Sequence, residues 1–123
     1  FYHGSLPKNE LYKILPDFHA AIIPLKTRIH GAVPSKIFET TSMGIPILFC
    51  GGGEGAEIVT EFGIGMTSQP GNYKKLEDNI QQLKQMNQDQ YWNLKTQCYE
   101  TAKKEFNFEK QIQALDKKLK SII

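Results

Sequence analysis

Residues 30–49, HGAVPSKIFETTSMGIPILF, hold a loop, a short helix and an apolar strand in direct succession. Pro34 stands at the start of the helical segment and Gly44 follows its end at Met43, a placement that is typical of a helix. The apolar run IPILFC (45–50) comes next. Because it does not alternate with polar residues, it is typical of a strand that helices cover on both faces.

The same alternation continues on both sides of this stretch. Further strands are predicted at FYHG (1–4), AAIIPL (20–25) and GIGMTS (63–68), and further helices at Pro7–Leu15 and Glu54–Phe62. Strands that alternate with helices favour right-handed βαβ units and a parallel sheet. We therefore predict one α/β domain over residues 1–123, with a Rossmann-like parallel sheet and flanking helices.

Three amphipathic helices are predicted after the last strand. Asn72 is placed to cap the first of them, a second runs from about residue 88 to 105, and a third begins at Phe108. Each carries apolar residues at helical spacing, so we expect each to pack by that face. The apolar residues are Leu76, Ile80, Leu83 and Met86 in the first, Tyr91, Leu94, Cys98 and Ala102 in the second, and Ile112, Leu115, Leu119 and Ile122 in the third.

The composition excludes several function classes. The 123 residues carry a net charge of +2 and no run of basic residues, so we expect no nucleic-acid partner. No apolar run is long enough to span a bilayer. Cys50 and Cys98 lie far apart without metal spacing, which favours free thiols and a cytoplasmic location. The chain opens without Met inside a predicted strand, so we expect it to be part of a longer protein.

The amino end of the helix at Pro34 is the first candidate site. Loops that follow parallel strands bind ligands at the carboxyl edge of the sheet, and a helix amino end favours phosphate. Gly31 and the backbone of Val33 and Pro34 would admit a diphosphate, Ser35 would offer a hydroxyl and Lys36 a charge. Glu39, one turn beyond Ser35, would accept hydrogen bonds from ribose hydroxyls. The alternative is that Ser35 caps the helix while Lys36 and Glu39 are surface residues.

Two glycine turns are weaker candidates. CGGGEGAEI (50–58) imitates a dinucleotide fingerprint, but no acidic residue ends a strand about twenty residues later and no Gly-Lys-Ser/Thr follows. Gly53 and Glu54 are therefore expected near a ligand, or only as a flexible turn and a helix-dipole partner. Gly4 and Ser5 end a strand at the same edge, or form an ordinary turn. The histidines lack metal spacing, so we expect neither a metal nor a cofactor.

With these segments in order, VPSKIFETTSMGIPIL resembles the sugar-nucleotide-binding segment of GT-B glycosyltransferases of family 4, with its P-S-K-x-x-E and G-x-P pattern. The flanks FYHGSLPKNELYKIL, GEGAEIVTEFGIGMTSQPGNYKKLEDNI and EFNFEKQIQAL are similar to neighbouring segments of that family. The resemblance implies a retaining transferase that moves a sugar from a UDP- or GDP-sugar to a glycan or lipid-linked acceptor, in capsule, lipopolysaccharide or other glycan assembly.

By this resemblance Glu39 grips the donor ribose, Val33–Lys36 face the diphosphate, and Gly4–Leu6 lie by the base. The first glutamate of the family's E-x7-E motif falls on Gly31. The acceptor domain and the basic pair that contacts the phosphates would lie upstream of Phe1, so we expect this chain alone to be inactive and the full protein to be cytoplasmic or peripheral to the inner membrane. A bare sheet edge at residues 1–4 predicts self-association. The alternatives are a nucleotide-sugar 2-epimerase and a non-catalytic α/β ligand-binding domain.

Overall fold

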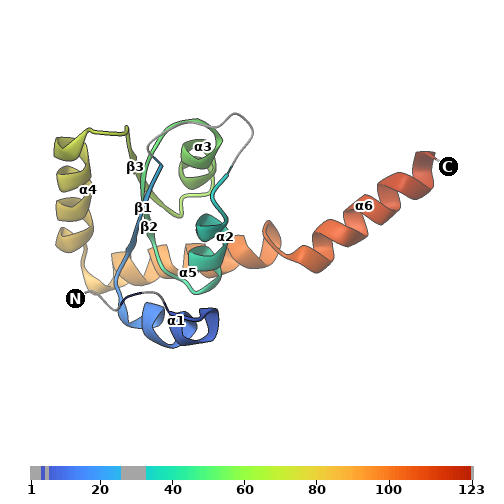
Figure 1. Ribbon diagram of the computed structural model, residues 1–123, viewed down its shortest axis with the longest axis horizontal. Helices are drawn as coiled ribbons and strands as arrows, with labels where there is room; N and C mark the ends of the chain where they lie inside the picture. Colours follow the sequence, from blue (N-terminus) through green and yellow to red (C-terminus); the bar gives the residue numbers. More distant parts are fainter. Residues whose placement is uncertain (1–3, 5, 26–32, 123) are drawn as a thin grey trace.

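The computed structural model describes residues 4, 6–25 and 33–122, and its centre is a three-stranded parallel sheet (Figure 1). The strands lie in the order β1 (Ala21–Pro24), β2 (Ile47–Cys50) and β3 (Gly65–Ser68). Ile23 pairs with Phe49, and Phe49 with Thr67. The predicted Rossmann-like α/β fold is confirmed.

The helices occupy the predicted segments. Between the strands lie α2 (Ser35–Ser42) and α3 (Gly53–Glu61), and the chain ends in three helices. Before β1, α1 passes directly into a short 3₁₀ turn. The predicted strand at 1–4 falls on residues outside the description except for Gly4, which is in no strand. The remaining elements are α1 (Lys8–Ile14), η1 (Leu15–Asp17), α4 (Tyr73–Gln85), α5 (Gln88–Lys104) and α6 (Phe108–Ile122).

The core lies between the sheet and the pair α2 and α3. Ile23 and Phe49 point from the strands toward Ile37 of α2 and Val59 of α3, and these side chains are buried. The opposite face of β2 and β3 is covered by α4 (Figure 1). There the buried Asn79 donates a hydrogen bond to the Thr67 carbonyl of β3 at 2.9 Å. Strand β2 is therefore covered on both faces, as its apolar sequence predicts. The same prediction for residues 20–25 is wrong, because α4 packs against β2 and β3, and Ile22 of β1 is 53% exposed on that face.

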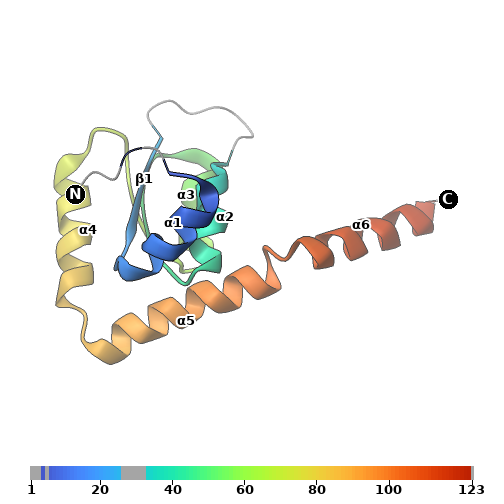
Figure 2. The same cartoon turned by 60° about the horizontal axis from the view of Figure 1, so that its bottom comes forward.

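Helix α5 runs along the amino-terminal edge of the sheet (Figure 2). Its side chains donate hydrogen bonds to backbone carbonyls that come just before each strand. The three bonds are Tyr91 to His19 before β1 (2.7 Å), Lys95 to Gly44 before β2 (2.9 Å) and Gln97 to Phe62 before β3 (2.8 Å). Because α5 covers the amino-terminal edge, a ligand can reach the ends of the strands only from the carboxyl edge.

Helix α6 departs from the expectation that each amphipathic helix packs by its apolar face. It extends away from the rest of the molecule (Figures 1 and 2). Its apolar side chains Ile112, Leu115, Leu119 and Ile122 are 48–73% exposed. Just before α6, the Phe106 ring meets Phe38 and Phe62 edge to face. None of the helices within the described ranges has the length and apolar character needed to cross a bilayer.

Candidate functional site

The amino end of α2 lies at the carboxyl edge of the sheet and has no side-chain cap. Pro34 is the N-cap residue and Ser35 is the first helical residue. The N-cap residue makes no side-chain hydrogen bond, and Ser35 lies inside the helix rather than at its cap, so the alternative role of Ser35 as the cap is wrong. An uncapped first turn leaves backbone N–H donors for another acceptor, and the helix dipole adds partial positive charge there.

The next helix, α3, also begins without a side-chain cap. Its N-cap is Gly52, and Gly53 has φ +71°, a conformation that favours glycine. Glu54 is exposed in its first turn, where a carboxylate stabilises the helix dipole. The third helix of this edge, α4, differs, because the Asn72 side chain accepts a bond from the Lys75 N–H at 3.0 Å. The capping role predicted for Asn72 is confirmed.

Packing explains part of the glycine-rich turn before α3. A Cβ on Gly51 would lie 3.0 Å from both the Leu25 Cβ and the Phe49 ring. A Cβ on Gly55 would lie 2.7 Å from the same ring. These glycines therefore allow the loop and helix to close over Phe49, whether or not a ligand binds there.

Lys36 and Glu39 come together at one cavity beside the amino end of α2. The cavity has a volume of about 320 Å³ and lies between α2, β1 and the α1–η1 segment. Lys36 is exposed and Glu39 is half-buried. The other lining residues are Tyr12, Leu15, Ala21, Ile22, Ile23 and Thr40. Thr40 anchors this turn by donating a hydrogen bond from its hydroxyl to the Lys36 carbonyl at 2.6 Å.

Of the other residues predicted for the site, some are described by the structure and some lie outside the described residues. Ser35 is exposed and does not line the cavity, so Glu39 shares the cavity with Lys36 and not with Ser35. Val33 is half-buried and packs on the core. Gly4 is exposed, with φ +75° and open space around it. Ser5 and Gly31 lie outside the described residues.

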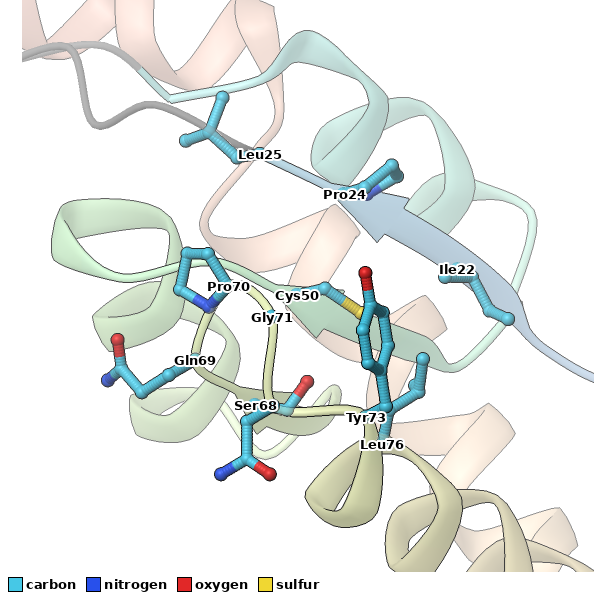
Figure 3. Close-up of a pocket in the computed structure, with 11 residues that line it drawn as sticks. Ile22, Pro24, Leu25, Cys50, Ser68, Gln69, Pro70, Gly71, Tyr73 and Leu76 are labelled. Carbon is cyan, nitrogen blue, oxygen red and sulfur yellow. The ribbon is translucent and has the colours of Figure 1, made fainter.

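A larger cavity of about 610 Å³, which the sequence did not predict, lies where the three strands end (Figure 3). Ser68, Gln69 and Tyr73 line it together with apolar residues. These residue types carry no catalytic or metal-binding signature, and the only local signal was the turn PGN at 70–72 before a helix. Within the described ranges, no cluster of three or more His, Cys, Asp or Glu side chains is arranged to hold a metal ion.

Comparison with known proteins adds no relative: no protein-family model, curated protein or solved structure matches this chain. The structure therefore establishes a small Rossmann-like α/β domain with a three-stranded parallel sheet, and any function must be argued from the site itself.

Proposed function

We propose that this chain is the donor-binding part of a retaining glycosyltransferase and binds a nucleoside diphosphate sugar at the amino end of α2. The order of segments around PSKIFE, which resembles family 4 of the GT-B enzymes, supports the proposal. The position of this segment at the carboxyl edge of a parallel sheet also supports it, because such edges are where α/β folds bind ligands.

The observation that carries the proposal is the cavity shared by Lys36 and Glu39. It contains one cation and one carboxylate on successive turns of α2, next to an uncapped helix amino end. A nucleoside diphosphate needs a site for anionic oxygens and an acceptor for two vicinal hydroxyls. The backbone of Val33–Lys36 and the Lys36 ammonium supply the first, and the Glu39 carboxylate supplies the second.

The same groups would assist the chemistry of transfer. When the bond between sugar and diphosphate breaks, negative charge builds on the departing diphosphate. The positive end of α2 and the Lys36 ammonium stabilise that charge, and they stabilise it more as it grows. Transfer itself also requires an acceptor. The acceptor-binding domain of such enzymes is not among the segments that this chain resembles.

Calorimetric titration of the chain with UDP and GDP tests this role. Glu39→Gln replaces the carboxylate that accepts hydrogen bonds from the ribose hydroxyls with a neutral amide. We therefore expect about tenfold weaker binding of the ribonucleotides. The 2′-deoxy and 3′-deoxy diphosphates should lose less affinity on the same substitution, since each lacks one of the hydroxyls. The matched control is Glu61→Gln, the same change at an exposed residue at the far end of α3, which should leave binding unchanged.

Two results would contradict the proposal. One is an equal loss of affinity for ribo- and deoxyribonucleotides in Glu39→Gln, which would show that Glu39 does not accept hydrogen bonds from the ribose hydroxyls. The other is failure of both diphosphates to bind the unmodified chain.

A further inference from the structure

The larger cavity has a floor made by the last residues of all three strands. Pro24 of β1 pairs with Cys50 of β2, and Cys50 pairs with Ser68 of β3, so their side chains lie in a row on the α4 side of the sheet. Tyr73 and Leu76 of the first turn of α4 form the wall (Figure 3). A volume of about 610 Å³ is in the range of small-molecule pockets, and the carboxyl edge is where parallel sheets carry them.

Among the described residues, the lining of this cavity contains no Asp, Glu, Lys, Arg or His. Its residues are apolar, or carry a hydroxyl, a thiol or an amide. By contrast, the cavity at α2 holds Lys36 and Glu39, and the two linings share only Ile22. The part of a ligand that fits here is therefore uncharged and mainly apolar.

Ser68 is a buried polar residue whose hydroxyl is directed at this cavity. The residue is only 5% exposed, and its hydroxyl has no hydrogen-bond partner among the described residues. In that part of the chain, every fully enclosed side-chain nitrogen or oxygen has a partner, so the Ser68 oxygen is not sealed in the core. A hydroxyl in such a place gains a bond only from what enters the cavity.

Tyr73 stands at the opposite side of the opening with its ring 80% exposed. It is the first residue of α4, and the Asn72 cap fixes the turn that holds it. In Figure 3 its ring rises over the strand ends, above Cys50. An exposed aromatic ring beside an apolar cavity offers a stacking surface.

From this arrangement we propose that the cavity binds the neutral, planar heteroaromatic ring of a small molecule, with the ring face on Tyr73 and a polar edge at Ser68. A sugar ring fits less well, since its many hydroxyls would meet few polar side chains there. A purely aliphatic chain would leave the Ser68 hydroxyl unsatisfied. This inference goes beyond the proposed function, because it concerns a different cavity and does not need a diphosphate or Glu39.

Uncharged nucleosides are suitable probes. The chain is titrated with adenosine and uridine while the backbone amide signals of residues 68–76 are followed by NMR. We expect saturable shifts in this segment, and none with ribose alone. Tyr73→Ala should weaken nucleoside binding about tenfold because the stacking surface is lost, while Tyr73→Phe should retain it. The exposed Trp92 lies on α5, at the opposite edge of the sheet, so Trp92→Ala is the matched control and should have no effect.

Ser68→Ala tests the polar edge of the ring separately, and nucleoside binding should weaken by several-fold. The proposal is overturned if neither nucleoside shifts the 68–76 signals at millimolar concentration, if ribose shifts them equally, or if Tyr73→Ala binds like the unmodified chain. Loss of nucleoside binding in Glu39→Gln but not in Tyr73→Ala would place the ring in the α2 cavity instead. That result would overturn this inference and leave the proposed function standing.

Discussion

At the scale of single residues, Cys98 places an ionisable group in the core. Its side chain is fully buried, and the thiol donates a weak hydrogen bond to the Ile64 carbonyl at 3.7 Å. Burial raises the pKa of Cys98 from its ordinary value of 9.0 to about 11, although the nearby Lys95 charge acts in the opposite direction. The folded protein therefore keeps this proton at a pH where the unfolded chain releases it.

This pKa shift makes the stability depend on pH in a predictable direction. Because the folded pKa is higher than the unfolded one, the contribution of Cys98 is complete below about pH 9 and is lost as the pH rises toward about 11. Urea unfolding of the unmodified chain and Cys98→Ala measures it. We expect the stability difference between them to shrink by about 1 kcal/mol from about pH 8 to about pH 10. Parallel pH profiles for the two proteins would contradict this prediction.

At the scale of elements, the sheet depends on close contact between β2 and β3. Gly65 lies directly opposite Ile47, and a Cβ at Gly65 would overlap the Ile47 backbone carbonyl. This carbonyl belongs to the backbone of a central strand, so it cannot move aside as a flexible side chain would. The glycine is thus required by strand pairing and not by turn geometry.

We expect Gly65→Ala to separate β2 from β3 and to lower the free energy of unfolding by about 3 kcal/mol or more, measured in urea. Gly71→Ala is the matched control. Gly71 has φ +80° and open space around it, so only backbone strain of about 1–2 kcal/mol opposes a side chain there. Equal losses in the two variants would show that contact with Ile47 is not what restricts residue 65.

The elements also differ in how they close the two edges of the sheet. The bonds from Tyr91, Lys95 and Gln97 hold the amino edge through three backbone carbonyls. At the carboxyl edge, α2 and α3 begin without side-chain caps. The larger cavity, where the three strands end, therefore lies on the side of the sheet that α5 leaves open, whereas the cavity of Lys36 and Glu39 lies beside residues 21–23 of β1.

At the scale of the whole molecule, the fold follows from local sequence patterns. Apolar runs, Pro34 and Gly44 around α2, and the Asn72 cap place the three described strands and the α-helices within about three residues of the bounds that were predicted for them, whereas η1 was not predicted. These signals are local, and tertiary packing agrees with them.

The site was predictable only where residue types carry chemistry. Lys36 and Glu39 stand out in a sequence because they are charged. Spacing alone did not decide between Ser35 and Lys36 as the neighbour of Glu39, because positions three and four residues away on a helix are equally near. Ser68 and Tyr73 became candidate site residues only when strand register placed Pro24, Cys50 and Ser68 in one row.

The place of α6 in the molecule could not be predicted, because periodicity shows that a helix has an apolar face but not what covers it. Since that face is exposed here, a chain ending at Asn107 should unfold in urea within about 0.5 kcal/mol of the full chain. Phe106→Ala is the control, and losing its edge-to-face contacts with Phe38 and Phe62 should cost more than about 1 kcal/mol. If removing α6 costs as much as Phe106→Ala, the helix supports the fold after all.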